Sequence, residues 1–450
     1  MRYAEELSRN TRRNLKYSVG DAGSFGAMVG LGETYLPAFA LAVGMGEANA
    51  GLVASLPVVA GGFMQLISLK AMRFFGDEQR WVVICATVQA LAFIPLIAAA
   101  FYGTISMPML LLIATLYWGS GLASGPAWNT WMESIVPSSI RARYFSRRSR
   151  FQQSATLIAL VCSGAILHWA KSGDWLLIGF ATVFIGASLS RAISVWCLAR
   201  HHTNPRLLQR SRERSTTATS SSMTRKGRRL LAYLITVQAC VQISGPFFAP
   251  YMLEQLKFSY GQYVFLMSVA FLSRIIAITR WSSVTDRFGA PTLLWIGAIG
   301  LIPLPTLWVV SSSIWWLAIA QICSGIAWAA YELGFFLLFF ETLPPNRRMK
   351  MLTYYNLGNT TAMFVGASFG AAMLSYLGCT PKAYFTLFAI SSVGRVLALG
   401  LLLRTKLKPV PIHALAVRVL GIRVSAAPLD MPILSSLSES DAADDESADD

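Results

Sequence analysis

The amino-acid sequence predicts an all-α membrane protein with twelve transmembrane helices in two pseudo-symmetric six-helix halves. Three observations support this class: twelve apolar stretches of spanning length, basic residues concentrated in alternate connections, and an internal repeat. The composition agrees, because 54% of the 450 residues are hydrophobic, only 13% are charged, and the mean hydropathy is +0.51. A typical soluble domain contains about 25% charged residues.

The twelve stretches are each long enough to cross a bilayer. A helix needs about 20 predominantly apolar residues for this, because each residue rises about 1.5 Å and the backbone finds no water to bond in the hydrocarbon. We predict spans at residues 17–44, 49–70, 81–102, 107–135, 151–170, 175–198, 230–253, 261–280, 291–310, 313–341, 352–377 and 383–403.

Basic residues predict the orientation of these spans. Of 38 Lys and Arg, 32 lie before the first span, after the last span or in alternate connections, 3 lie in the opposite connections and 3 lie within spans. Short cytoplasmic loops retain Lys and Arg, so we expect both termini in the cytoplasm, in a bacterial inner membrane. The net charge of +16 is then a topology signal, and its dispersal along the chain argues against nucleic-acid binding.

The chain divides into four segments by composition. The halves are residues 1–199 and 230–404, and a cytoplasmic loop at 200–229 with nine basic residues and a Ser/Thr run joins them. Residues 405–450 form a cytoplasmic tail whose acidic end is typical of solvated, disordered chain.

A repeat supports the division into halves. Ser120–Ala123 (SGLA) in span four matches Ser324–Ala327 (SGIA) in span ten, 204 positions later. Glu133 and Glu341 follow the two matches, each before a proline and a pair of arginines. Transporters built from such repeats bind substrate between the halves near mid-membrane.

The connection between spans eight and nine carries the sharpest motif. Ser282–Gly289 reads SSVTDRFG and resembles the cytoplasmic GxxxD(R/K)xG motif of the major facilitator superfamily, with the first Gly replaced by Ser. In the first half, residues 69–76 keep the basic Arg73 and the glycine Gly76 but lack the Asp. The resemblance covers residues 12–405 in topology.

The resemblance implies an inner gate. Asp286 would meet the start of span five near Phe151, where free N–H groups and the helix dipole favour an anion, and Gly289 would end the motif. Arg287 would pair with Glu341 at the cytoplasmic end of its own half. By the repeat, Glu133 is the candidate partner of Arg73, and Gly76 completes that loop. The alternative is that these are solvated turn charges.

Charged residues inside spans are the candidates for substrate binding and coupling. The resemblance implies that spans one, four, seven and ten line a central cavity, and three acids lie on them: Glu33 and Glu332 near mid-depth, and Asp21 nearer the cytoplasmic end. Each needs a partner or water, because a charge at the bilayer centre costs about 2.5–3.5 kcal/mol. Asp21 could instead face the headgroups. For Arg274 in span eight, a structural ion pair is as plausible as substrate contact.

Aromatic and amide side chains accompany these charges. Trp128 and Asn129 lie in span four, and Tyr331 lies beside Glu332 in span ten. Gln238 and Gln242 share one face of span seven, which suits two hydrogen bonds to one ligand or hydrogen bonds between helices. Gly245-Pro246 predicts a bend in span seven, whereas the glycines of spans one and eleven predict close helix packing.

These features favour a secondary transporter that moves a small molecule by alternating access. Protons are the expected coupling ion, because carboxylates are available, while sodium coupling and uncoupled diffusion stay open. The alternative is a non-transporting membrane sensor or scaffold with a transporter-like fold. The sequence contains no phosphate-binding loop, catalytic motif or metal-ligand cluster, so we expect no enzyme, cofactor or metal, and a monomer in the lipid bilayer.

Overall fold

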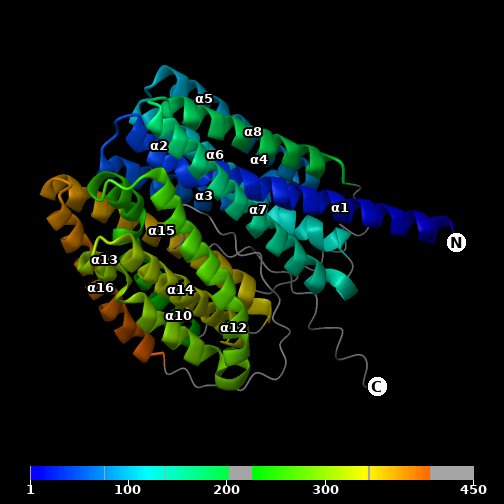
Figure 1. Cartoon of the computed structure of the whole chain (residues 1–450). Helices are drawn as coiled ribbons and strands as arrows, with labels where there is room; N and C mark the ends of the chain where they lie inside the picture. The colour runs from blue at the N-terminus through cyan, green and yellow to red at the C-terminus, as the bar shows by residue number, and fades with distance from the viewer. Residues whose placement is uncertain (1, 76, 137, 202–224, 343–344, 406–450) are drawn as a thin grey trace.

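The structure is a computed structural model, and it describes residues 2–75, 77–136, 138–201, 225–342 and 345–405. These residues are almost entirely helical (Figure 1). In the N-terminal half the elements are α1 (Arg2–Leu31), η1 (Glu33–Tyr35), α2 (Leu36–Ala42), α3 (Glu47–Phe75), α4 (Glu78–Leu91), α5 (Phe93–Tyr102), α6 (Met107–Ile135), α7 (Ser138–Ser172) and α8 (Leu176–Ala199). In the C-terminal half they are α10 (Arg225–Ser244), η2 (Gly245–Phe247), α11 (Phe248–Pro250), η3 (Tyr251–Gln255), α12 (Tyr260–Leu301), α13 (Leu304–Val310), α14 (Ile314–Thr342), α15 (Pro345–Leu377) and α16 (Pro381–Leu403).

The helices confirm the predicted fold class. Within the described residues, eleven segments are long and apolar enough to cross a membrane. The remaining predicted span, 49–70, lies in the 29-residue helix α3. Several boundaries differ from the prediction; for example, α1 begins at Arg2 rather than near Tyr17, and α15 begins at Pro345 rather than near Leu352. Helix α7 begins at Ser138 rather than near Phe151, and α12 carries both span eight and the start of span nine across a kink at Gly289.

Spans one and seven are both broken. In span one, α1 ends at Leu31 and a 3₁₀ turn containing Glu33 precedes α2. In span seven, α10 ends at Ser244 and a 3₁₀ turn begins at Gly245, as the Gly-Pro pair predicts. The short α11 follows and ends at Pro250, and a turn of π-helix, η3, begins at the next residue. Broken spans at equivalent places in the two halves expose backbone groups that buried side chains must satisfy.

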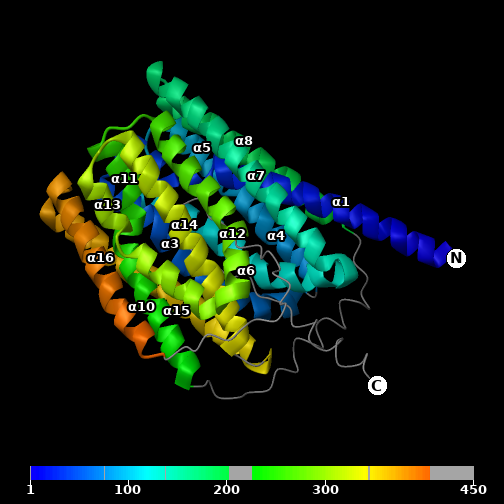
Figure 2. The same ribbon diagram turned by 60° about the horizontal axis from the view of Figure 1, so that its bottom comes forward.

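The helices pack in two groups that meet at one end of the molecule. In the first group, α1 packs on α7 and α8, and α3 packs on α6; in the second, α12 packs on α14, and α10 packs on α15 and α16. The groups diverge away from that end (Figure 1), and α1 projects from the bundle in both views (Figure 2). We call the end where they meet the distal end: it carries the α2–α3, η3–α12 and α15–α16 connections.

The apolar core has the same asymmetry. The largest cluster of buried apolar residues draws on both halves and includes Phe39, Phe180, Phe247 and Tyr263. Two further clusters are each confined to one half, one around Tyr233 and Trp328 and a smaller one around Trp131. The described core therefore joins the halves at the distal end.

Glycines bring α1 against α7, as the packing prediction for span one expected. A Cβ atom added at Gly30 would lie 2.3 Å from the carbonyl oxygen of Thr156, and one at Gly26 would lie 2.3 Å from that of Gln152. In span eleven, a Cβ atom at Gly366 would lie 2.2 Å from the carbonyl oxygen of Ala239. These contacts are backbone to backbone, so a side chain there requires the helices to separate.

This packing gives a test with a built-in control. Gly30→Ala should lower the unfolding temperature of the purified protein, because an overpacked core contact typically costs about 1–3 kcal/mol. Gly400→Ala, in α16, adds the same methyl group to a helical glycine with open space around it. That variant should be neutral or slightly stabilising, since Gly is less favourable than Ala in a helix. Equal unfolding temperatures for the two variants would contradict the close α1–α7 contact.

Candidate functional site

A buried ion pair lies in the N-terminal half. Asp21 on α1 is 4% exposed, and its Oδ2 atom lies 2.6 Å from Nη2 of Arg148 on α7. Its Oδ1 atom accepts a hydrogen bond of 2.7 Å from the hydroxyl of Ser194 on α8. Asp21 therefore does not face the headgroups, and the alternative that placed it there is wrong. The carboxylate instead ties three helices together.

Polar side chains extend from this pair toward Glu33. Arg191 donates to Ser194 at 2.7 Å and to Oε1 of Gln89 at 2.6 Å. Gln89 donates in turn to the carbonyl oxygen of Tyr117 at 3.1 Å, and the Tyr117 hydroxyl donates to Oε2 of Glu33 at 2.7 Å. All of these side chains are buried. The two candidate acids of span one are thus connected by a network through α8, α4 and α6.

Glu33 occupies the break in span one. It is the first residue of η1 and its side chain is fully buried. A 3₁₀ turn loses the regular i to i−4 bonding of the helix. The carboxylate is therefore held where the regular helical bonding of span one is interrupted.

The C-terminal half holds a second buried ion pair. Arg274 on α12 donates to both carboxylate oxygens of Glu332 on α14, and both residues are buried. Tyr331 and Trp328, on the same helix, pack edge to face at 5.8 Å between ring centroids. The structure therefore brings together three of the predicted residues, and Arg274 takes the ion-pair position that the sequence left open.

Arg395 compensates for the break in span nine. Its Nη1 atom donates to the carbonyl oxygen of Leu301 at 2.6 Å. In a continuous helix that carbonyl would accept from the backbone N–H of residue 305, but residue 305 is proline and has no N–H. Arg395 also reaches Ser244, where α10 ends, at 3.4 Å. One guanidinium thus satisfies groups at two helix breaks.

Arg191 and Arg395 are equivalent residues of the two halves. They lie 204 positions apart, the same spacing as Ser120 and Ser324. Each reaches the third spanning helix of its own half, through Gln89 or through the Leu301 carbonyl. This shared contact supports the internal repeat that the sequence predicts.

Of the remaining predicted site residues, the structure describes the side chains of three and not that of the fourth. Gln238 and Gln242 are buried on α10, and the amide of Gln242 has no hydrogen-bond partner among the described residues. Trp128 lies beside the first ion pair, because the Arg148 guanidinium carbon is 4.6 Å from its ring centroid. The side chain of Asn129 lies outside the described residues.

Most of the predicted inner gate lies outside the part of the chain that the structure describes. Gly76 is outside it altogether, and so are the side chains of Arg73, Glu133, Asp286, Arg287 and Glu341. Gly289 is described, and its φ of 79° is a conformation that favours glycine. The expected helix start near Phe151 is wrong, since α7 begins thirteen residues earlier and the Phe151 N–H lies inside the helix. Asp286 therefore has no helix N-terminus to meet at that position.

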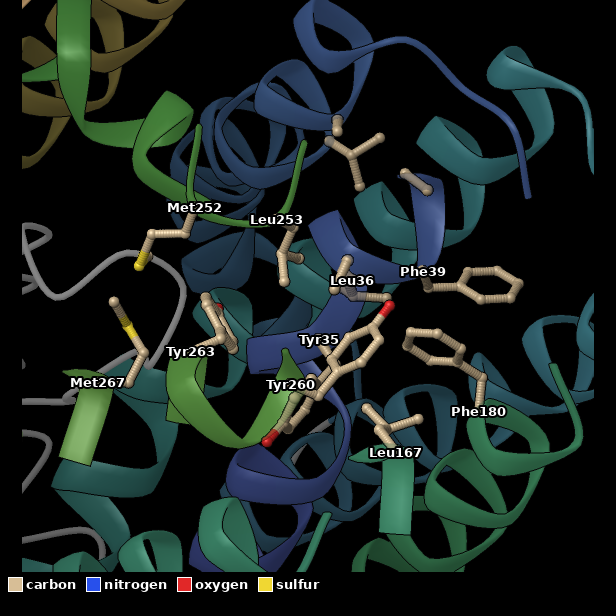
Figure 3. Close-up of a cluster of buried hydrophobic side chains, with 14 of the residues drawn as sticks. Tyr35, Leu36, Phe39, Leu167, Phe180, Met252, Leu253, Tyr260, Tyr263 and Met267 are labelled. Carbon is tan, nitrogen blue, oxygen red and sulfur yellow. The ribbon is translucent and has the colours of Figure 1, made fainter. Parts of the chain in front are cut away.

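The distal end is closed by aromatic side chains from both halves. Tyr35 of η1 faces Tyr263 of α12 at 6.2 Å between ring centroids, and Phe180 of α8 faces Tyr260 at 5.9 Å (Figure 3). The Tyr35 hydroxyl donates to the Leu160 carbonyl of α7 at 2.8 Å. No charged side chain is drawn among these labelled residues, and the cluster forms an apolar seal between the halves.

Sequence reasoning missed several members of these clusters. Arg148 was counted with the basic residues of a cytoplasmic loop, although it is 8% exposed within α7. Gln89 and Ser194 are single polar residues in apolar spans, which is a usable signal, because such residues need partners in a membrane. Tyr117 gave no signal distinct from an interface aromatic residue.

Comparisons with known proteins agree with this architecture. Residues 230–425 match the sequence model of the Major Facilitator Superfamily. A mutant of the nucleoside transporter NupG aligns with a TM-score of 0.67 at 15% identity, covering 88% of this chain and 100% of that one. A bacterial homologue of the iron transporter ferroportin, inward-facing, gives 0.67 at 14%, with 89% and 100% covered. A D-xylose-proton symporter gives 0.64 at 13%, with 88% and 99% covered.

No curated protein sequence matches the chain. The family match covers the C-terminal half and part of the tail, and the structural alignments extend the same fold over both halves. The three structures are those of proteins named as transporters or as a symporter, and their likeness to this chain is one of fold. The chain is thus a multi-pass membrane protein whose C-terminal half is similar in sequence to the Major Facilitator Superfamily and whose fold over both halves is similar to that of these solved structures.

Proposed function

We propose that the protein is a secondary transporter that moves a small molecule by alternating access, coupled to protons. One observation carries this proposal. Each half contains a buried ion pair, whereas the contact between the halves at the distal end is an apolar seal. Buried ion pairs hold each half together as a unit, while the seal between units contains mostly apolar contacts. Separation of such an interface breaks none of the ion pairs found among the described residues, because each of these pairs lies within one half.

The seal supports the alternating part of the proposal. Aromatic contacts close the distal end, whereas the two further apolar clusters are each confined to one half. We call the end opposite the distal end the proximal end. Transport requires the reverse arrangement as well, in which the distal contacts separate and the proximal ends meet. We retain Asp286, Arg287, Gly289, Glu341, Arg73, Gly76 and Glu133 as proposed members of that proximal contact.

The carboxylates support the coupling part of the proposal. Asp21, Glu33 and Glu332 are buried on the spans that line the cavity in this family, and each is held by a hydrogen-bond donor from another helix. A movement that changes burial or removes a donor changes the proton affinity of a carboxylate. Trp128, Tyr331, Gln238 and Gln242 are the proposed substrate-contacting groups on these spans.

The fold leaves the substrate class open among several chemistries, because the aligned structures are named for a nucleoside, iron and D-xylose. Purified protein in liposomes loaded with a pH-sensitive dye tests the proposal directly. A nucleoside, D-xylose and a divalent metal ion are added outside in turn, and proton movement and solute uptake are recorded. The panel is then widened to other classes of solute, and a transporter should move at least one of them across the membrane. A sensor or scaffold moves none, and consistently flat traces would reject the transport proposal.

Orientation has its own test. We predict that both termini and residues 200–229 are cytoplasmic in a bacterial inner membrane, from the distribution of basic residues. Residue Ser220 lies in the part of this segment outside the described residues. A single cysteine at Ser220 should react with an impermeant reagent only after the cells are broken. Reaction in intact cells would reverse the predicted topology.

A further inference from the structure

A polar cluster joins the two halves beside the distal seal. Glu47 is the first residue of α3, in the N-terminal half. Its Oε1 atom accepts a hydrogen bond of 2.7 Å from the side-chain amide of Gln255, at the end of η3. Its Oε2 atom accepts from the hydroxyl of Tyr384 on α16. The Gln255 amide also donates to the Cys379 carbonyl at 2.8 Å, so the carboxyl group contacts η3 and α16 directly and is linked through Gln255 to the α15–α16 connection.

The surroundings fix this carboxyl group in place. Tyr384 is fully buried and packs against Tyr251 at 5.0 Å between ring centroids. One turn along α3, a Cβ atom added at Gly51 would lie 2.2 Å from the ring of Phe247. The start of α3 therefore sits directly on the broken part of span seven. Separation of the halves at this end must pull Glu47 away from both of its donors.

The charges facing Glu47 are few among the described residues. Glu254 and Lys257 lie nearby and pair with each other at 3.0 Å, Cys379 presents a thiol, and Tyr384 presents its hydroxyl. The direct partners of the carboxyl group are thus neutral. Partial burial among neutral groups disfavours the charged form of a carboxylate, and hydration after separation restores it.

The electrostatics agree with the geometry. Burial raises the pKa of Glu47 above its usual value, although the hydrogen bonds from Tyr384 and Gln255 oppose this rise. A carboxyl group with a higher pKa in the closed state than in the open state binds more protons when closed. Protonation then favours closure, and this advantage is lost as the pH rises through the closed-state pKa.

We propose that Glu47 is a distal gate residue whose protonated carboxyl group bridges Gln255 and Tyr384 and holds the distal side shut. When protonated, it accepts from the Gln255 amide and donates its proton to the Tyr384 oxygen. Ionisation places an incompletely hydrated charge in the contact and favours opening. The inference rests on the alternating access proposed above, and it adds control by the pH on the distal side.

The test measures opening without any substrate. A reporter cysteine replaces Leu253, which is 7% exposed in the seal (Figure 3), in a background whose native cysteines are replaced by alanine. Full-length protein in nanodiscs reacts with a maleimide over a range from about pH 5 to about pH 8. Each rate is divided by the rate of the same cysteine in denatured protein at the same pH, which removes the titration of the thiol.

Four forms are compared. In the parent protein the normalised rate should rise with pH, by up to about tenfold for each unit by which the closed-state pKa exceeds the open-state pKa. Glu47→Gln, a neutral isostere that still accepts and donates, should show the slow rate at every pH. Glu47→Ala removes both bonds and should react about tenfold faster or more, without pH dependence. Glu254→Gln, on the same surface but paired with Lys257, should keep the parent profile.

Several outcomes would overturn the gate. One is a Glu47→Gln variant that keeps the parent pH dependence, and another is a Glu47→Ala variant that reacts at the parent rate. A merely structural role would lower the unfolding temperature of Glu47→Ala and leave the normalised rates unchanged, which also rejects the proposal. Flat liposome traces combined with the expected labelling would reject transport and retain the gate, so the two failures are distinguishable.

Discussion

Replacing Arg274 with methionine should lower the free energy of unfolding by about 3–5 kcal/mol, because it leaves the buried carboxylate of Glu332 without its guanidinium. Both side chains are nearly inaccessible to water, so solvent cannot replace the lost partner. The double variant Arg274→Met/Glu332→Gln removes the second charge as well. It should recover most of the loss, since the cost arises from the unpaired charge and not from the absence of the pair.

Thermal inactivation of the purified protein in detergent measures these differences. Arg80→Met is the matched control: Arg80 lies 3.9 Å from Asp77, but its side chain is 77% exposed. Surface pairs of this kind contribute about 0–1 kcal/mol, so that variant should inactivate at nearly the parent temperature. If Arg274→Met behaves like Arg80→Met, or if the double variant is no more stable than the single one, the pair does not hold α12 against α14.

The sequence predicts the fold well because membrane physics restricts it strongly. Apolar stretches of spanning length must be helices, and the twelve predicted stretches correspond to helical segments in the described structure. Helix ends are less certain, because polar residues outside the bilayer continue a helix without an apolar signal. Thus α7 extends back to Ser138 through a basic segment, and this extension carries Arg148 into contact with Asp21.

The candidate site was only partly predictable for a related reason. A charge inside a span is visible in the sequence, so Asp21, Glu33, Glu332 and Arg274 could be named. Their partners depend on which helices are neighbours, and that depends on packing between residues more than 50 positions apart. Glu47 gave no signal at all, because an acidic residue at the first position of a helix is expected from the helix dipole alone.

The most informative functional variant is Glu33→Gln. Glutamine still accepts the Tyr117 hydrogen bond through its side-chain oxygen, so the contact is preserved while the titratable proton is lost. If Glu33 carries the coupling proton, this variant should lose accumulation driven by a pH gradient and should keep exchange of substrate at equal pH. A parent that couples one proton to one solute would accumulate it about tenfold across a gradient of one pH unit.

Tyr117→Phe is the control for Glu33→Gln. It removes the hydrogen bond but leaves the carboxyl group, so accumulation should persist with a changed rate or pH optimum. Glu332→Gln is the competing candidate, and it must be measured together with Arg274→Met/Glu332→Gln, because the single variant leaves Arg274 buried without its carboxylate. A loss of accumulation shared by both forms, with folded yield restored in the double variant, would assign coupling to Glu332. Accumulation at the parent level in both Glu33→Gln and the double variant would show that neither acid carries the proton.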